Sequence, residues 1–207
     1  MTAKKAAPRP SYHHGDLRKA LLDAAEAELA DKGIEGFTLR GCAKRAGVSH
    51  AAPAHHFRDA DALLTALAAE GFERFLATIE AHRPRDASPR EQLGGAGLGY
   101  VTFALAHPAL FRLMFSSSRP DFSDAHLQQR SKAAFDDLVD NVARIRGDDP
   151  RQSEAGMADV AAAWAIVHGL ADLLLTERMA FLKSLAPERR EPILAAIIAR
   201  SFPPPAR

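Results

Sequence analysis

Apolar positions recur every three or four residues along most of the chain, and alanine and leucine supply most of them. This spacing places apolar side chains on one face of a helix, whereas the alternation typical of strands is nearly absent. The first such face consists of five apolar residues: Leu17, Leu21, Ala24, Ala25 and Leu29. We therefore expect an all-α protein with about nine helices.

Capping residues and helix breakers set the expected boundaries. Ser88, Pro89 and Glu91 combine a serine cap, a proline at the first helical position and a glutamate three residues after the cap. Glycines such as Gly33 stand where a helix end needs a left-handed residue. The expected helices span residues 15–32, 38–45, 50–57, 60–83, 89–106, 108–115, 124–146, 153–183 and 187–201.

Composition narrows the class of protein. The chain has 207 residues, 47% hydrophobic and 26% charged, so it can bury the core of one large or two small domains. Its most apolar run, residues 161–175, contains His168 and Asp172 and is shorter than the roughly 20 residues of a membrane span. The basic N-terminus is not followed by the apolar stretch of a secretory signal. We expect a cytoplasmic protein with no membrane segment.

Charge is distributed unevenly although the net charge is only +1. Residues 1–58 hold ten Lys and Arg against six Asp and Glu, whereas the remainder holds 17 against 20. The first part also holds five of the nine histidines. A basic N-terminal part on a slightly acidic body is a partial footprint of an anionic partner. Chance variation over a window of this size is the alternative.

Residues 38–57 have the layout of a helix-turn-helix: two short helices joined by a tight turn at Gly47. The second helix of such a unit lies in the major groove of DNA, with its N-terminal residues facing the base edges. It is poor in large apolar residues, Pro53 falls early enough to be tolerated, and Phe57 can anchor its end in the core. Because other α proteins also contain two short helices around a glycine turn, this spacing alone leaves DNA binding open.

Two stretches carry a resemblance to a known family. The run from Tyr12-His13-His14-Gly15-Asp16-Leu17-Arg18 through FTLRGCAKRAGVSHAAPAHHFRDADALLTAL (37–67) resembles the DNA-binding domain of the tetracycline-repressor-like (TetR/AcrR) regulators of bacteria. HPALFRLMF (107–115) and Trp164-Ala-Ile-Val-His168-Gly169 resemble the effector-binding half of the branch with a tryptophan…histidine-glycine signature.

This resemblance implies a homodimeric, ligand-responsive repressor that binds a palindromic operator in double-stranded DNA and is released by a small, largely apolar effector. It also implies the domain organisation. We expect a disordered basic arm (1–11), a helix-turn-helix DNA-binding domain (12–58), a connecting helix (59–83), a ligand-binding and dimerisation domain (84–202) and a short tail (203–207).

The resemblance assigns Thr38 to phosphate contact and a group of residues to the groove-facing side of the second helix: Ser49, His50, Ala51, Ala52 and His55. Further DNA-binding candidates are polar or basic neighbours: Arg40, Lys44, Arg45, His56 and Arg58. Many relatives have tyrosine where this chain has Ala54 and lysine where it has Ala60, and both usually touch phosphate. Their loss should weaken the salt-dependent part of DNA binding. The alternative is compensation by other basic residues: Arg40, Lys44, Arg58 and the arm with Lys4, Lys5 and Arg9.

The histidine pairs and the single cysteine do not suggest a metal site. Adjacent histidines on a helix point about 100° apart, and no carboxylate or cysteine is spaced to complete a ligand set. Cys42 cannot form an intrachain disulfide and is expected to be a small buried residue. Histidines gain positive charge below neutral pH, so DNA affinity should rise modestly as the pH falls. We expect no metal and no cofactor.

Sensor candidates lie in the second half. Trp164 and His168 are four residues apart and share one helix face with Asp172. Together with an upstream aromatic and methionine set they would line a mostly apolar cavity: Phe103, His107, Phe111, Met114 and Phe115. The alternative for each of these residues is ordinary core packing. Small and aliphatic residues of the last two helices are suited to a dimer interface: Ala158, Ala161, Ala162, Ala165, Leu194, Ile197 and Ile198.

Two other functions remain as alternatives. One is a DNA-binding regulator without a ligand, which a sealed or filled cavity would favour. The other is a small-molecule enzyme that uses His168 and Asp172 as an acid/base pair and His107 as a second base. The sequence has no nucleophile elbow, metal-binding cluster or glycine-rich phosphate loop. We therefore expect no enzyme and no catalytic residues.

Overall fold

The computed structural model describes residues 14–200, and within that range it contains nine α-helices and two short 3₁₀ helices without a strand. The all-α prediction is therefore confirmed. The expected basic arm and the tail lie outside the described residues.

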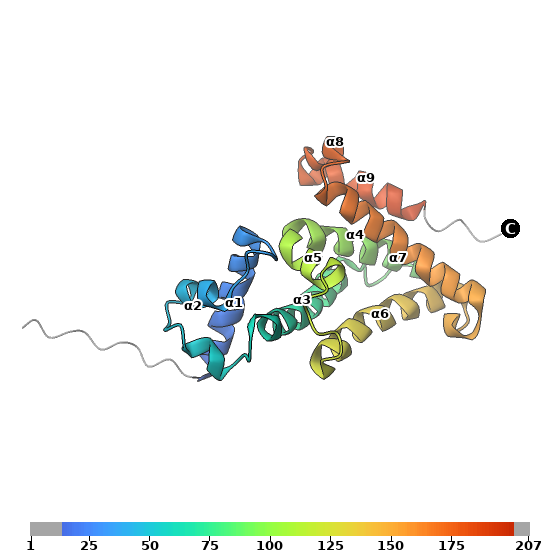
Figure 1. Cartoon of the computed structure of the whole chain (residues 1–207). Coiled ribbons are helices and arrows are strands. Elements are labelled where there is room, and N and C mark those ends of the chain that lie inside the picture. The colour runs from blue at the N-terminus through green and yellow to red at the C-terminus, as the bar shows by residue number, and fades with distance from the viewer. Residues whose placement is uncertain (1–13, 201–207) are drawn as a thin grey trace, which may run out of the picture.

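The N-terminal lobe comprises α1 (His14–Lys32), α2 (Leu39–Arg45), the 3₁₀ helix η1 (Ala52–His55) and the chain up to residue 59. Helix α1 packs against α2 and against α3 (Ala60–His82), the long helix that leaves the lobe (Figure 1). Leu21, Phe37 and Phe57 are almost fully buried in its core. Cys42 is buried too, and burial raises the pKa of its thiol to about 11, so it behaves as an apolar core residue, as expected.

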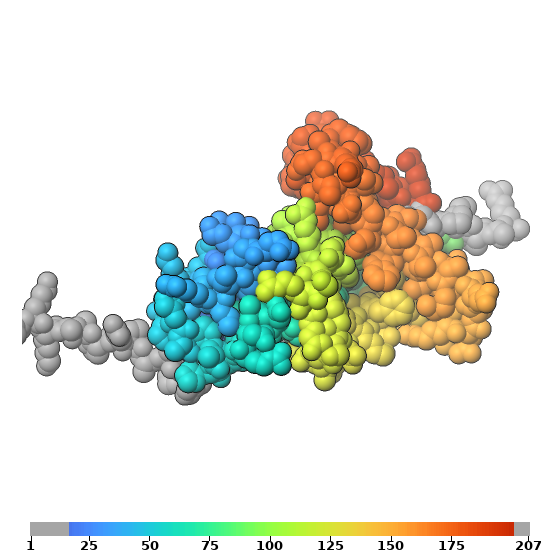
Figure 2. All heavy atoms as spheres, viewed as in Figure 1, coloured from blue at the N-terminus to red at the C-terminus, as the bar shows by residue number. Residues whose placement is uncertain are grey.

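The helical body contains α4 (Pro89–Ala106), α5 (Pro108–Ser116), α6 (Ala125–Arg146), η2 (Pro150–Gln152), α7 (Glu154–Leu175), α8 (Ala180–Lys183) and α9 (Pro187–Ala199). Helix α3 packs against both α4 and α6, and α4 in turn carries α7 and α9. In the space-filling view of Figure 2 the N-terminal lobe stands beside this body, and the segment around α8 projects from it. Helix α3 therefore belongs to both parts.

Most expected helix boundaries are confirmed by their caps. The Thr38 hydroxyl accepts a hydrogen bond from the Gly41 N–H at 3.0 Å, at the start of α2. Ser88 and Glu91 form a reciprocal capping box before α4, and Gly147 ends α6 in the left-handed region with φ +82°. Each of these features is local in sequence, which is why the sequence alone predicts it.

The predictions of two helices are wrong. The helix expected at 50–57 is a single 3₁₀ turn, Ala52–His55, because Pro53 has no N–H to bond the Ser49 carbonyl, and that carbonyl accepts instead from Ala52 at 3.0 Å. The helix expected at 153–183 is divided into α7 and α8. Glu177 adopts a positive φ of 62° at the break, a conformation that a continuing α-helix does not allow.

Helix α7 is long and apolar enough to cross a membrane by composition alone, in contrast to the expectation from sequence. The bent pair α4 and α5 would pass the same test as one broken span. One or two such helices are weak evidence, since a core helix of a soluble protein also passes. Only 33% of the apolar window of α7 is buried within the chain, so much of this helix is left uncovered.

Candidate DNA-binding surface and ligand cavity

The segment that follows α2 has one side buried in the core of the N-terminal lobe and the other side exposed to solvent. Pro53 and Phe57 are buried, the latter with 5% of its surface exposed. Four of the residues predicted to face the groove are exposed: Ser49, His50, Ala51 and His55. The fifth, Ala52, is half-buried. We call residues 49–57 the recognition segment. Its small and polar residues face outward because its apolar ones are held in the core.

Helix α2 lies very close to α1. A Cβ on Gly41 would lie 1.9 Å from Glu28 Oε1, so glycine lets the buried Glu28 carboxylate pass beneath α2. Arg45 donates to this carboxylate and to that of Asp31. The guanidinium of Arg45 is thus engaged within the lobe and holds α2 on α1, a structural role that differs from the DNA contact for which Arg45 was a candidate.

The remaining basic candidates differ in their exposure and in whether they already bind another residue of the protein. Arg40 and Lys44 are exposed, and neither forms an ion pair with any residue of the described range. Arg58 is exposed but donates to Asp59 at 2.7 Å, beside the cap of α3. His56 turns inward, where its buried Nε2 has no hydrogen-bond partner among the described residues. Arg40 and Lys44 are therefore better placed for phosphate than Arg58 or His56.

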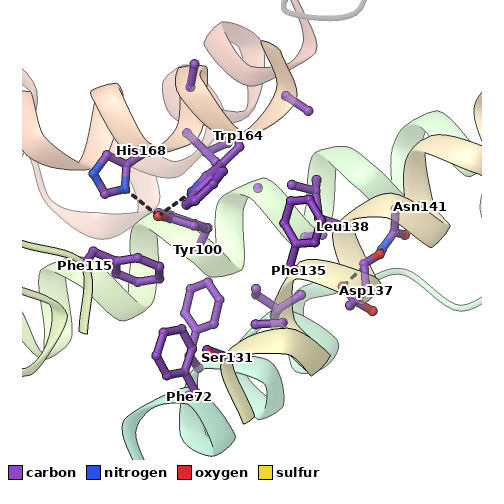
Figure 3. Close-up of a pocket in the computed structure, with 18 of the residues that line it drawn as sticks. Phe72, Tyr100, Phe115, Ser131, Phe135, Asp137, Leu138, Asn141, Trp164 and His168 are labelled. Atoms are coloured by element: carbon purple, nitrogen blue, oxygen red, sulfur yellow. Dashed lines mark hydrogen bonds between the residues drawn. The ribbon is translucent and has the colours of Figure 1, made fainter. Parts of the chain in front are cut away.

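A cavity of about 550 Å³ opens in the helical body between α3, α4, α6 and α7 (Figure 3). Four of the predicted residues line it: Met114, Phe115, Trp164 and His168. Most of the wall consists of residues that were not predicted for it, among them Phe72 and Phe75 of α3 and Phe135 of α6. They belong to regular apolar faces, and nothing in their spacing distinguishes a cavity wall from a filled core.

Three polar groups meet on one side of the cavity. The Tyr100 oxygen lies 2.7 Å from His168 Nδ1 and accepts a hydrogen bond from Trp164 Nε1 at 3.3 Å (Figure 3). Burial raises the pKa of the Tyr100 hydroxyl well above its usual value, against a smaller opposing effect of Trp164. Tyr100 is therefore protonated. Its oxygen accepts from the indole N–H, so its own O–H is free to donate to His168, and Nδ1 is the acceptor of that hydrogen bond.

The other polar end is formed by α6 and the start of the loop after α3. Arg83 Nη2 donates to both carboxylate oxygens of Asp137, at 2.8 and 3.0 Å. Asn141 donates to the backbone carbonyl and the carboxylate of Asp137, and its own amide oxygen accepts from Arg144. Asp137 and Asn141 line the cavity, but their polar atoms are already engaged within the protein.

Four residues predicted for the cavity do not line it. Phe103 and Phe111 are buried in the core, because their helix positions turn them away from the cavity. His107 lies between α4 and α5, where it contacts Arg74 and Glu26. Asp172 is exposed on α7, since the helix has turned away from the cavity by that point. The acid/base pair considered for an enzyme is therefore not assembled in the cavity.

The residues predicted for a dimer interface divide into two groups. The four predicted alanines of α7 are exposed: Ala158, Ala161, Ala162 and Ala165. Ala161 and Ala165 also line the cavity. Leu194 and Ile198 of α9 are only 2% and 1% exposed, so they are core residues and cannot meet a partner. Their helix packs on α4, where a Cβ on Gly97 would lie 2.9 Å from Ile198 Cγ2. Ile197 is half-buried.

Arg119 joins the helical body to the N-terminal lobe. It lies in the loop between α5 and α6, and its Nε donates to Asp61 at 2.8 Å, at the start of α3. Its Nη1 donates to the backbone carbonyl of Ile34 at 2.7 Å, in the α1–α2 loop, and its guanidinium lies 5.9 Å from the Phe37 ring centroid. The same loop contains Phe122 and follows Phe115 at the end of α5, and both phenylalanines line the cavity.

A second link joins α1 to the same body. Arg74 of α3 donates to both carboxylate oxygens of Glu26, at 2.5 and 3.1 Å, and lies 3.0 Å from His107 Nδ1. Burial acts to raise the pKa of Glu26, but the hydrogen bonds and charge of Arg74, aided by His107, lower it below its ordinary value. Sequence reasoning missed Glu26, Arg74 and Arg119, because pairs so far apart along the chain leave no local pattern.

Within the described range no group of three or more His, Cys, Asp and Glu side chains could hold a metal ion. The arrangement consists instead of an exposed recognition segment, one long helix leading from it, and an apolar cavity against that helix. Such an arrangement is typical of a helix-turn-helix protein whose N-terminal lobe is attached to a helical body with an apolar cavity.

Comparison with known proteins identifies the family. A family model described as bacterial regulatory proteins of the tetR family matches residues 21–67, and one described as the tetracyclin repressor-like C-terminal domain matches residues 93–200. The HTH-type transcriptional repressor Rv1474c of Mycobacterium tuberculosis is 42% identical over 71 residues, which are 34% of this chain and 38% of that protein. The chain thus aligns with little more than a third of that repressor.

Solved structures extend the similarity to the whole fold. A protein with unknown function from Rhodococcus sp. RHA1 is 32% identical, with 94% of this chain and 99% of that chain covered and a TM-score of 0.72. A TetR-like transcriptional regulator from the same organism shares the fold at 18% identity, with 94% and 97% covered and a TM-score of 0.63. The chain belongs to the TetR family of DNA-binding transcriptional regulators. This is a family of regulators and not of enzymes, as predicted.

Proposed function

We propose that this protein is a homodimeric repressor that binds a palindromic operator and is released from it by a small, largely apolar effector. The observation that supports this most is the recognition segment, whose polar residues are exposed while Pro53 and Phe57 fix it in the core. Thr38 at the α2 cap and the exposed Arg40 and Lys44 are assigned to phosphate. Five residues of the recognition segment are assigned to the major groove: Ser49, His50, Ala51, Ala52 and His55.

Effector release would work through α3. Phe72, Phe75 and Ile79 of this helix line the cavity, and the start of the same helix carries the N-terminal lobe. A ligand that fits only one position of α3 shifts the population toward that position. In a dimer this changes the distance between the two recognition segments from the roughly 34–36 Å that successive major grooves require.

The proposal keeps the domain boundaries expected from sequence, with a DNA-binding domain at 12–58 and a ligand-binding and dimerisation domain at 84–202. It also places the protein in the cytoplasm, where its operator would be. The open apolar cavity favours a ligand-responsive regulator over one without a ligand. Repression, and not activation, is supported by the name of the Mycobacterium tuberculosis relative.

Selection of bound fragments from random-sequence DNA tests this function. The full chain should enrich one palindromic sequence, and His50→Ala and His55→Ala should each reduce affinity for it by about tenfold or more through lost base contacts. His126→Ala, an exposed histidine at the start of α6, is the matched control and should leave affinity unchanged. Enrichment of no sequence, or equal losses for all three variants, would contradict the proposed role.

A further inference from the structure

We propose that the effector is an uncharged, drug-sized aromatic molecule, and that the cavity discriminates against anions. This inference rests on the proposed function, because it assigns a ligand class to the cavity described above. The volume of about 550 Å³ lies within the range of pockets that enclose such ligands.

Aromatic rings dominate the cavity wall. Figure 3 shows five of these rings, which come from different elements and surround the space from several directions: Phe72, Tyr100, Phe115, Phe135 and Trp164. Phe75 also lines the cavity. Several already pack edge to face, with ring centroids 5.0 Å apart for Phe75 and Tyr100 and 5.7 Å apart for Phe75 and Phe115. A flat aromatic ligand would extend this packing, in which the positive edge of one ring meets the face of another.

The cavity also contains large aromatic side chains that the protein itself leaves uncovered. Phe122, Phe135 and Trp164 keep 40%, 37% and 40% of their surface exposed, although all three line the cavity. Rings of this size stabilise a structure most when they are removed from water. Their exposure around one cavity indicates a site that an apolar molecule completes.

Charge decides which molecule fits. Asp137 is the single charged side chain among the residues that line the cavity within the described range. Arg83, which is bound to it, stands behind it and also donates to Glu80 at 2.6 Å. With Arg144, which donates to Asn141, this polar end holds two carboxylates and two guanidiniums and so carries no excess positive charge. An anion entering the cavity would lose its hydration and find no cation in the wall, which is a large cost.

The polar groups of Tyr100, Trp164 and His168 can accommodate one uncharged polar group of the ligand. The Tyr100 hydroxyl is occupied by Trp164 and His168, and His168 Nδ1 is occupied by Tyr100. This leaves His168 Nε2 as the donor available to a hydroxyl or carbonyl oxygen. A ligand with aromatic rings and one such oxygen would therefore satisfy both the apolar wall and its polar corner.

Three probes with the same ring system test the ligand class: 2-naphthalenemethanol, 2-naphthoate and 2-naphthylmethylammonium. Isothermal titration calorimetry with the full chain at about pH 8 minimises charge on histidine. The alcohol should bind at least about tenfold more tightly than the carboxylate, because only the carboxylate must bury an unpaired charge. The alcohol should also bind more tightly than the ammonium compound, because the Asp137 carboxylate is already engaged by Arg83 and Asn141 and cannot compensate a ligand cation for its lost hydration.

Two pairs of variants locate the effect in the cavity. Phe135→Ala should weaken binding of the alcohol by about fivefold or more, whereas Phe181→Ala, an exposed phenylalanine outside the cavity, should not change it. Ser131→Lys adds a cation to the cavity wall and should raise naphthoate affinity about tenfold relative to the alcohol. Ala133→Lys, exposed on the same helix outside the cavity, should leave the preference unchanged.

Tighter binding of naphthoate or of the ammonium compound by the unaltered protein would overturn the inference and assign a charged effector. Failure of the alcohol to bind at about 1 mM would also overturn it, since even weak complementarity should be detected there. In either case, selective DNA binding that persists would show that the ligand class alone is wrong. If the unaltered protein binds the alcohol but binds no DNA sequence selectively, that result would instead contradict the proposed regulator function.

Discussion

At the scale of single residues, Thr38 combines a structural role with a proposed functional one. Its hydroxyl accepts a hydrogen bond from the Gly41 N–H and caps α2, the helix that precedes the recognition segment, and Thr38 is exposed. An alanine substitution would confound the two roles, because losing an N-cap costs about 1 kcal/mol by itself.

Substitution of Thr38 by aspartate separates the roles. Asp is as good a cap as Thr, so the free energy of unfolding of Thr38→Asp should stay within about 0.5 kcal/mol of the unaltered protein. Its negative charge beside phosphate should nevertheless lower DNA affinity at least about tenfold. Thr38→Ser should preserve both properties. Urea unfolding and DNA titration at one stated salt concentration measure them, and an affinity unchanged in Thr38→Asp would remove Thr38 from the DNA-binding surface.

At the scale of elements, the attachment of α1 to α3 depends on Glu26 and Arg74. The pKa of Glu26 is lower in the folded protein than its ordinary value of 4.5. Its contribution to stability is therefore complete above about pH 4.5 and is lost as the pH falls through the lower folded value.

Removing the charge of Glu26 should flatten this acid dependence. Glu26→Gln should lower the free energy of unfolding at neutral pH by about 1 kcal/mol, because a partly buried, bidentate ion pair is lost. Below about pH 4 the difference from the unaltered protein should shrink. Thermal unfolding between pH 3 and 7 measures this, with the exposed Glu35→Gln as control. A difference that stays constant with pH would contradict the assignment.

The loop between α5 and α6 links the cavity to the N-terminal lobe through Arg119. We expect Arg119→Ala to leave DNA affinity without effector within about threefold and effector affinity unchanged, since it touches neither ligand. The loss of DNA affinity on effector binding should become at least about fivefold smaller. Arg112→Ala, which removes a bond to the Leu175 carbonyl and leaves the lobe untouched, is the control. Equal coupling in both variants would exclude the loop as the link.

Comparison at this scale shows which parts of the structure a sequence can predict. Caps such as Ser88 and breakers such as Gly147 act within a few residues, so the helices they bound were predicted correctly. The early position of Pro53 is compatible with an α-helix, but the segment forms a 3₁₀ turn because it is too short to compensate for the missing N–H. The bond from Arg119 to the Ile34 carbonyl joins residues 85 positions apart and left no pattern to recognise.

The cavity was predicted only in part for a related reason. Trp164 and His168 were found through their spacing on one helix, whereas Tyr100, which binds both, lies on another. Periodicity shows which face of a helix is apolar but not whether a neighbouring helix fills the space in front of it. Phe103 and Phe111 were therefore indistinguishable in sequence from the residues that do line the cavity.

At the scale of the whole molecule, the apolar surface of α7 points to a partner. Much of this helix is uncovered within the chain, and its exposed alanines form a face of small residues. Small side chains allow two helices to approach closely, as in helical bundles. Since Leu194 and Ile198 are buried, we expect a second copy of the chain to contact α7 and the outer face of α9, where Ile193 is 39% exposed.

A charge on the α7 face should separate the subunits. Ala162→Glu is exposed and does not line the cavity, so it should leave the fold intact while placing two like charges near each other across the interface. Analytical ultracentrifugation at micromolar concentration should show a dimer for the unaltered protein and for Ala133→Glu, and mainly a monomer for Ala162→Glu. A dimer that persists in Ala162→Glu would place the interface elsewhere.

Hydroxyl-radical footprinting of the selected DNA site tests the central claim most directly. A dimer that inserts one recognition segment into each of two successive major grooves predicts two symmetric protected patches, centred about 10 base pairs apart or a multiple of that distance. At a protein concentration near the Kd of the unaltered chain, both patches should be strongly weakened in His55→Ala. A single patch, protection without symmetry, or uniform protection of any sequence at low salt would contradict the account of this chain as a dimeric, operator-specific regulator.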